Sequence, residues 1–357
     1  MRTLNFVTMN DTEKRTELHE LGKYRLLERL SEGIEPRNRT TALGLGHDAS
    51  AMSPAKRRVV MSSGLMLEGI HFNLTYFPLK HLGYKSLVAQ LGRIYAMNAT
   101  PQQAQVVLGV SGRFGVEELE ALVGGVRLAA SRYGVDLVGL DVASSYTGLT
   151  VGISVLGQCD ARELVGRSGA GEHQLLCLTG RLGAAYMGQQ LLERERLVFE
   201  ANPHAQPQLE AYGYLLERIL KPELRGVAAV LEGLRGVEVL PTAMTLVHEG
   251  LASALLHICQ RSAVGCRVYA DRIPIDPQAT TLAEELHIDP LTAAMNGGED
   301  YELLFTVPMD KHEAVAALPD VSIIGHITAA DTGAYLVPPH GDDIRITAQG
   351  WNAIAAE

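Results

Sequence analysis

The stretch that decides the fold is Asn296-Gly297-Gly298-Glu299-Asp300-Tyr301-Glu302-Leu303-Leu304-Phe305. Two glycines free the backbone to turn tightly, and two adjacent acids follow them. The apolar run after the acids predicts the start of a strand. Carboxylates beside a tight turn suit a polar or cationic ligand, but the same string also fits a solvated loop that leads into a core strand. Its meaning therefore depends on the rest of the chain.

The totals describe an ordinary globular protein. The chain has 357 residues, enough for two domains, with 46% hydrophobic and 20% charged residues. Its formal net charge of -10 argues against a general nucleic-acid binder. No apolar run is long enough to cross a bilayer, and the N-terminal sequence MRTLNFVTMNDTEKRTE has no apolar signal core. We therefore expect a cytoplasmic protein without nucleic-acid or membrane partners.

The cysteines indicate neither a disulfide framework nor a zinc site. They are scattered and form no Cys-x-x-Cys pair, so buried free thiols are the simpler expectation. The positions are Cys159, Cys177, Cys259 and Cys266.

Hydrophobic periodicity predicts a mixed α/β chain in two halves. A small, polar stretch at 167–172 marks the expected boundary, which gives domains 1–166 and 167–357. Helices are expected at 11–31, 79–97, 116–133 with Gly134 as the stop, 184–199, 212–220 and 250–261. Strands are expected at 58–64, 106–110 as a buried strand, 135–141 ending on an acid, 149–156, 174–180, 266–269, 322–325 and from 302 onward.

Two further features carry weaker predictions. Leu43 to Ser50 is glycine-rich, and such a loop either presents N–H groups to phosphate or simply turns. His71 stands alone among apolar neighbours, which favours a satisfied core histidine.

The motifs, taken together and in order, resemble thiamine-monophosphate kinase. That family belongs to the superfamily of aminoimidazole ribonucleotide synthetase and selenophosphate synthetase. The Gly-Gly-Glu-Asp-Tyr-Glu-Leu string is the most specific landmark. The others are Gly44–Asp48, Glu68–Phe72, Tyr84–Ser86, Ala96-Met97, Gly139–Asp141, Arg167–Ala170, Thr179–Gly183, Lys221-Pro222 and Glu249–Leu251.

The resemblance implies a fold and a reaction. The fold would be α/β (α+β), with an N-terminal ATP- and Mg²⁺-type domain whose sheet pairs with a second copy in a dimer barrel. A C-terminal α/β domain would complete the cleft. The family reaction moves the γ-phosphoryl group of ATP onto thiamine monophosphate, giving thiamine diphosphate, and Mg²⁺ held by carboxylates neutralises the crowded phosphates.

This chain departs from the family pattern at the aspartates. The resemblance maps former metal positions onto His47, Gly64, Arg93 and Leu246, none of which carries a carboxylate. It leaves Asp48, Ser62, Asp141 and Glu249 as the implied metal positions. Since Arg93 puts a fixed cation where a ligand anion is expected, we expect the site to hold fewer Mg²⁺ ions and still to attract phosphates.

The substrate positions depart less. The resemblance implies that thiamine monophosphate contacts His71, Glu299, Asp300 and Trp351, and that the nucleotide contacts Asp141, Arg167 and His248. An aromatic face at Trp351 suits a thiazolium or a pyrimidine. Structural roles stay open for three of these residues: Trp351 capping the core, Glu299 bonding backbone amides, and His71 buried and neutral.

Three functions follow from these observations. The first is a working thiamine-monophosphate kinase with unusual ligands, in which Asp48, Asp141 and Glu249 hold at least one Mg²⁺, although the missing aspartates lead us to expect a kinase-like protein whose phosphotransfer is weak or absent. The second is a pseudoenzyme, a regulatory protein that binds a thiamine phosphate or a nucleotide without catalysis. It would act as a homodimer or as a heterodimer with an active paralogue. The third, a sister enzyme with another substrate, is disfavoured because sister reactions also use ATP and Mg²⁺.

Overall fold

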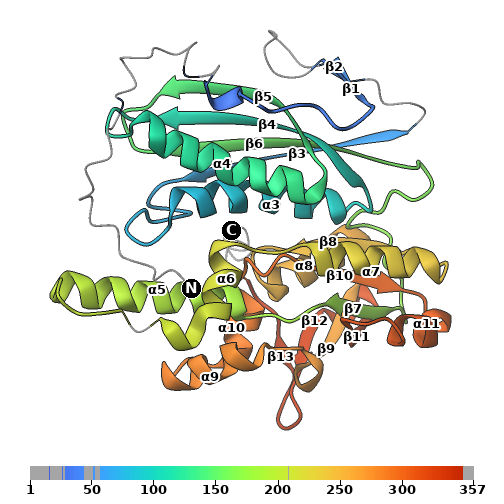
Figure 1. The fold of residues 1–357 in the computed structure, drawn as a ribbon. Helices are drawn as coiled ribbons and strands as arrows, with labels where there is room; N and C mark the ends of the chain where they lie inside the picture. The colour runs from blue at the N-terminus through green and yellow to red at the C-terminus, as the bar shows by residue number, and fades with distance from the viewer. Residues whose placement is uncertain are drawn as a thin grey trace, which may run out of the picture. The chain divides into compact units, whose positions relative to one another are not determined.

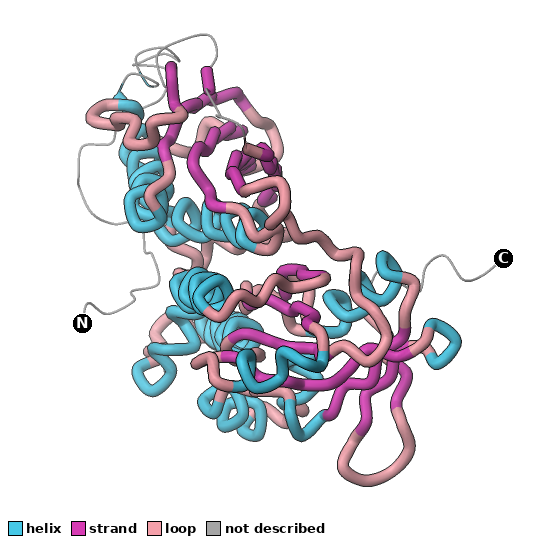
Figure 2. Tube along the Cα trace, turned by 90° about the vertical axis from the view of Figure 1, so that its right-hand side faces the viewer, coloured by secondary structure: helices cyan, strands magenta, loops and turns pink. Residues whose placement is uncertain are grey.

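The chain divides into two compact units. This computed structural model describes residues 16, 26, 29–43, 51–52, 57–207 and 209–348. Unit 1 comprises residues 1–94 and 99–161, and unit 2 comprises residues 95–98 and 162–357. The mixed α/β class predicted from the sequence is confirmed, with the observed division at 161/162 rather than 166/167. Figures 1 and 2 show that each unit has one main sheet with helices packed beside it, while β1 and β2 of unit 1 form a separate two-stranded sheet.

Unit 1 is built on a four-stranded sheet with the order β3-β6-β4-β5. Helices α3 and α4 lie across one face of this sheet (Figure 1). β4 and β5 run parallel, whereas β6 pairs antiparallel with both β3 and β4. The bounds are β1 Thr41–Leu43, β2 Ala51–Met52, β3 Arg58–Leu67, α3 Leu79–Tyr95, β4 Thr100–Val110, α4 Val116–Tyr133, β5 Asp136–Ser144 and β6 Thr150–Cys159.

The two faces of this sheet differ in burial because side chains alternate along each strand. Toward the helices, Val151, Ile153 and Val155 of β6 are at most 2% exposed. On the other face, the exposed apolar side chains are Val59 (48%), Met61 (70%), Leu65 (54%) and Val107 (51%). The prediction of a buried strand at 106–110 is therefore wrong for Val107, since helices cover only one face.

Helices α3 and α4 touch through their backbones. A Cβ atom on Gly83 would lie 1.9 Å from the carbonyl oxygen of Leu122, and one on Gly125 would lie 1.9 Å from that of Lys80. Any larger side chain at either glycine would push the helices apart. α4 ends as predicted, with Gly134 at φ 66° as its left-handed cap.

Unit 2 contains a seven-stranded sheet with the order β13-β12-β9-β11-β7-β10-β8. Every neighbouring pair is antiparallel except β12 with β9. The strands are β7 Leu175–Thr179, β8 Ala243–Val247, β9 Gly265–Tyr269, β10 Glu302–Val307, β11 Val321–Thr328, β12 Ala334–Val337 and β13 Ile344–Arg345. The helices are α5 Ala184–Ala201, α6 Gly213–Leu220, α7 Arg225–Gly236, α8 Leu251–Ser262, α9 Pro277–Glu285, α10 Pro290–Asn296 and α11 His312–Ala316.

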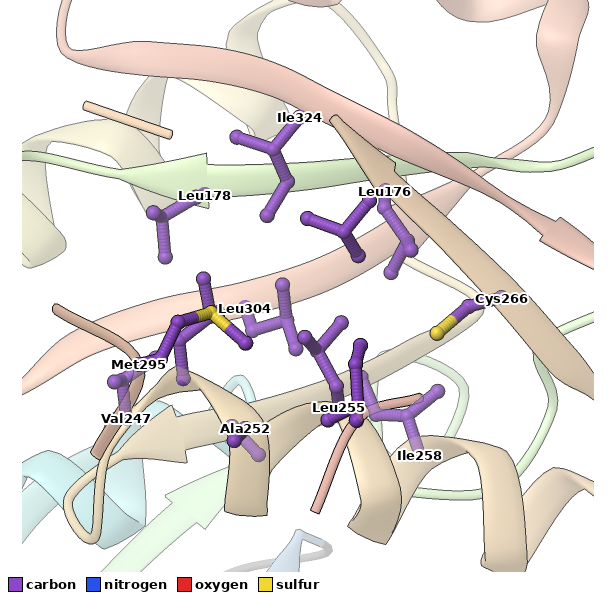
Figure 3. Close-up of a cluster of buried hydrophobic side chains, with 14 of the residues drawn as sticks. Leu176, Leu178, Val247, Ala252, Leu255, Ile258, Cys266, Met295, Leu304 and Ile324 are labelled. Carbon is purple, nitrogen blue, oxygen red and sulfur yellow. The ribbon is translucent and has the colours of Figure 1, made fainter. Parts of the chain in front are cut away.

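The core of unit 2 lies between this sheet and α8 (Figure 3). Leu255 and Ile258 of α8 face Leu176 of β7 and Ile324 of β11, and all four are 0% exposed. Burying each such side chain contributes about 1.5–3 kcal/mol to the free energy of unfolding. The same core holds Cys259 and Cys266, and all four cysteines are buried free thiols, as predicted.

No helix among the described residues is both long and apolar enough to span a bilayer. Most of the helix predicted at 11–31 and all of the loop at 44–50 lie outside the described residues. The strand predicted to end at Asp141 continues to Ser144 instead.

Candidate functional site

Two loops of unit 2 meet beside the paired strands β8 and β10. The loop after β8 carries His248 and Glu249, and the loop before β10 carries the Gly-Gly-Glu-Asp string. Because Glu302 lies opposite Val247 in the antiparallel register, the two loops leave the sheet at the same end. The Glu299 N–H donates to the carbonyl of His248 at 2.7 Å, which joins them directly.

The tight turn predicted at this string is present. Gly298 has φ +78°, and a Cβ atom there would lie 2.5 Å from the His248 carbonyl oxygen, so only glycine fits. Glu299 and Tyr301 also take positive φ values, 60° and 56°. Non-glycine residues pay about 1–2 kcal/mol each for this conformation. The loop is therefore held in a strained shape that aims its side chains.

An aromatic pair and two carboxylates line these loops. The His248 ring stacks on the Tyr301 ring, with centroids 5.4 Å apart and planes 21° apart. The Tyr301 hydroxyl donates to Glu299 Oε1 at 3.5 Å. Glu249 is exposed and accepts from the Ser253 hydroxyl at 3.4 Å. The structure thus brings the predicted residues His248, Glu249 and Glu299 onto adjoining loops.

Asp300 points into unit 2 and is only 1% exposed. Its Oδ2 accepts from the Gly183 N–H at 2.8 Å and its Oδ1 from the Ala185 N–H at 3.2 Å, at the start of α5. Burial raises the pKa of Asp300 to about 6, although these hydrogen bonds and the charge of Arg218 oppose the shift. The carboxylate caps a helix, and its predicted substrate contact stays a prediction.

Arg218 of α6 supports the same loop from below. Its Nη2 donates to the Asp300 carbonyl at 2.9 Å and to Glu302 Oε1 at 3.2 Å. Glu302 also accepts from the Thr179 hydroxyl at 2.6 Å. Burial raises the pKa of Glu302, and the nearby guanidinium opposes the shift. This ion pair is almost fully enclosed, so it fixes the base of the Gly-Gly-Glu-Asp turn.

Arg167 lies beside β8. Its Nε donates to the Thr245 hydroxyl at 3.0 Å. His257 of α8 lies close enough to Arg167 and Glu249 for their charges to act on it. Burial lowers the pKa of His257 and the positive charge of Arg167 lowers it further, whereas the carboxylate of Glu249 opposes both shifts. Leu246, a former metal position, is 7% exposed, so its apolar side chain serves packing.

In unit 1, Ser62 and Gly64 lie on the helix-facing side of edge strand β3. The Ser62 hydroxyl donates to Gln90 Oε1 of α3 at 2.9 Å. A Cβ atom on Gly64 would lie 2.0 Å from Gln90 Nε2. The buried Gln90 amide, 5% exposed, therefore fills the space into which a side chain at position 64 would grow.

Arg93 follows Gln90 by three residues, so both project from one side of α3. Its side chain is partly buried, and its Nε is buried without a hydrogen-bond partner in the described part of the chain. An unsatisfied buried donor costs about 1–3 kcal/mol. Three positions predicted from the sequence, Ser62, Gly64 and Arg93, thus gather around Gln90.

Asp141 lies apart from that group. It is exposed on β5, the opposite edge strand, in register with Val107 on the helix-free face. Three strand spacings of about 4.8 Å separate the two edges of the sheet. Unit 1 by itself therefore does not bring Asp141 to Ser62.

His71 is not a core histidine, so that interpretation is wrong. It is exposed in a turn where its Nδ1 accepts from the Leu67 N–H at 3.0 Å, and Phe72 takes the buried position. The surface position leaves its predicted substrate contact open as a prediction. His47, Asp48 and Trp351 lie outside the described residues.

The residues around Gln90 do not fit Mg²⁺. Magnesium prefers carboxylate, phosphate and water oxygens. Ser62 and Gln90 are neutral, Gly64 has no side chain and Arg93 is a cation. Among the residues that the structure describes, no group of three or more His, Cys, Asp or Glu side chains is arranged to hold a metal.

Sequence reasoning missed four side chains that shape these regions. Gln90 lies on α3 one helical turn before the predicted residue Arg93, and that spacing was the available signal. His257 lies on α8, which carries no predicted site residue, and gave no such signal. Arg218 and Thr179 gave no such signal, because only the folded sheet brings them to Glu302.

The fold and these loops define the class of protein. Residues 46–159 match the family model of AIR synthase related protein, N-terminal domain. The crystal structure of thiamine-monophosphate kinase from Stenotrophomonas maltophilia K279a matches with a TM-score of 0.71 and 27% identity, covering 87% of this chain and 94% of that one. AaThiL, solved in complex with AMPPCP and TMP, shares the fold with a TM-score of 0.69 and 23% identity, covering 93% of this chain and 99% of that one.

The particular family follows from a closer relative. Thiamine-monophosphate kinase from Salmonella typhimurium is 30% identical over 293 residues, covering 80% of this chain and 83% of that protein. This chain belongs to the thiamine-monophosphate kinase family.

Proposed function

We propose that this chain is a thiamine-monophosphate kinase-like protein that binds a thiamine phosphate and transfers phosphate from ATP weakly or not at all. The observation that carries the proposal is the group Ser62, Gly64, Gln90 and Arg93. At former metal positions this group offers a glycine whose side-chain space is filled and an arginine whose buried Nε has no partner among the described residues.

The argument from charge is direct. Phosphoryl transfer depends on positioning and on neutralising the charge that develops on the phosphates. Metal ions bridge the β- and γ-oxygens in kinases, and a single arginine reproduces only part of that clamp. Asp141 and Glu249 keep their carboxylates, but Asp141 lies at the far edge of the sheet from Ser62.

The ligand side is better preserved. Glu299 and His248 lie on joined loops, stacked and hydrogen-bonded through Tyr301. A solved structure with this fold holds both AMPPCP and TMP. We infer that the carboxylates of Glu249, which is exposed, and Glu299, which is half-buried, suit a cationic ligand such as thiamine monophosphate, while the buried Tyr301 ring holds His248 and Glu299 in place.

The test is a steady-state assay for thiamine diphosphate formation, with ATP and Mg²⁺ in excess and the Salmonella typhimurium relative as positive control. We expect a kcat at least a thousandfold below the roughly 1–100 s⁻¹ typical of kinases. Titration calorimetry with thiamine monophosphate should nevertheless show saturable binding. Turnover comparable to the control would refute the proposed loss of activity, and no binding would refute the proposed ligand.

The pseudoenzyme alternative is favoured by one observation, the apolar face of the sheet in unit 1. We propose that this face, with Met61 and Leu65 as its most exposed apolar members, pairs with a second copy or with a paralogue. Met61→Lys should shift the purified protein from dimer to monomer in light scattering, whereas Glu313→Lys, at an exposed position of unit 2, should not. A monomeric wild-type chain that also captures no family paralogue would contradict this version.

A further inference from the structure

We propose that Gln90 and Arg93 form a site for a phosphate oxyanion that works without a metal ion. This inference rests on the proposed function, because it assigns the phosphate-bearing end of the ligand to residues of this chain. It goes further by replacing the expected cation site with an anion site.

The first part of the site is the Gln90 amide. Because the Ser62 hydroxyl donates to Gln90 Oε1, the carbonyl end of the amide is occupied and the NH₂ end is left to donate. Gln90 Nε2 lies over Gly64, 2.0 Å from where a Cβ atom would begin. The missing side chain at Gly64 is thus what lets this donor occupy its position.

The second part is the Arg93 guanidinium. It stands one helical turn beyond Gln90 on α3, with its stem partly buried. Its Nε is enclosed and makes no hydrogen bond within the described part of the chain. Buried donors in native proteins are normally paired, so this one needs an acceptor from outside the described residues, such as a bound oxyanion.

The electrostatics of the group select an anion. Gln90 and Arg93 supply hydrogen-bond donors and one fixed positive charge. The Ser62 hydroxyl already donates to the Gln90 amide, and Gly64 has no side chain. A divalent cation would meet a guanidinium and no carboxylate among these four residues. A phosphate meets a planar fork whose paired N–H groups match two of its oxygens.

The neighbouring charges leave this arginine free for a ligand. In the described part of unit 1, Arg29 forms ion pairs with Glu117 and Glu120, and Arg113 forms one with Glu68. Arg93 takes part in none of these pairs. Its charge is therefore not already neutralised by a carboxylate of the described chain.

The experiment is titration calorimetry of the full chain with two probes, inorganic pyrophosphate and thiamine monophosphate, each in EDTA and in Mg²⁺. We expect at least one probe to bind in EDTA with a Kd within threefold of its value in Mg²⁺. Arg93→Gln should weaken that binding at least tenfold, and Arg93→Lys should restore part of it, because a lysine keeps the charge but not the fork. Arg345→Gln, at an exposed arginine of unit 2, removes the same charge and should change nothing.

The outcomes separate this proposal from the proposed function. Loss of binding in EDTA for both probes, or unchanged binding in Arg93→Gln with wild-type melting behaviour, overturns the oxyanion site. Thiamine monophosphate that binds independently of Arg93 overturns the oxyanion site while leaving the proposed ligand intact. Preference for pyrophosphate over thiamine monophosphate would assign the oxyanion to a nucleotide rather than to the thiamine phosphate.

Discussion

Replacing the buried Asp300 by asparagine should flatten the pH dependence of stability in unit 2. Burial raises the pKa of Asp300 from its ordinary 3.8 to about 6 in the folded chain. Since the folded pKa is the higher one, the folded state binds the proton more tightly than the unfolded state. The contribution of Asp300 to stability is therefore fully present below pH 3.8 and is lost as the pH rises through 6.

The magnitude follows from the shift. A difference of roughly 2 pKa units corresponds to about 3 kcal/mol, of which about 2 kcal/mol is lost between pH 4.5 and 7. Asparagine has the same shape, still accepts one N–H at the start of α5, and does not titrate. The free energy of unfolding of Asp300→Asn relative to wild type should thus rise by about 2 kcal/mol over that interval.

The assay is urea unfolding followed by circular dichroism at pH 4.5, 5.5, 6.5 and 7.5, with Asp310→Asn as an exposed control. The control should track wild type at every pH. Parallel curves for Asp300→Asn and wild type would refute the reasoning, because they would mean that the carboxylate titrates alike in both states. A variant that loses ground as the pH rises would show a lowered pKa in the folded chain.

Three further substitutions or modifications test other parts of the structure. Arg218→Gln should lower the free energy of unfolding by about 3–5 kcal/mol, because it leaves buried carboxylates without their cation. Arg225→Gln, at a side chain that is 69% exposed, should change that free energy by no more than about 0.5 kcal/mol. Equal effects of the two substitutions in chemical denaturation would contradict the ion-pair argument. Gly64→Asp should cost about 1 kcal/mol by displacing the Gln90 amide, and adding Gln90→Ala should recover most of it; a Gly64→Asp variant with wild-type stability would mean that the space is open. Burial raises the pKa of Cys177 to about 12, so iodoacetamide at pH 8 should label it only after unfolding, and rapid labelling of the native chain by mass spectrometry would show exposure.

Hydrophobic periodicity correctly predicted helices and strands whose apolar residues lie on one face. Its spacing placed a helix at 116–133, the bounds of α4, and its terminal glycine gave the stop. It placed the strand of Val107 but misjudged its burial, because which face of a sheet the helices cover depends on the topology of the whole unit. His71 was misjudged for a related reason: its apolar neighbours form a turn at the sheet edge, where Phe72 takes the interior position.

The sequence predicted which residues belong to the candidate site better than it predicted which of them lie close together. The acids and glycines of the string at 296–302 were visible in the sequence, as was the charge reversal at Arg93. That His248 and Glu299 share a surface follows from β8 lying beside β10, a strand order that no local pattern encodes. The same holds for Asp300, whose two backbone donors at the start of α5 come from more than a hundred residues away.

The glycine contact between α3 and α4 fixes the position of α3, the helix that carries Gln90 and Arg93. Gly83 lies two turns before Gln90 on a helix whose backbone rests directly on that of its neighbour. A methyl group added by Gly125→Ala would collide with the carbonyl oxygen of Lys80 and push α3 away from α4. The affinity of the proposed oxyanion site at Arg93 would then depend on Gly125, a residue of α4, although α4 carries no predicted ligand contact. A mutational screen for oxyanion binding would therefore also identify positions on α4.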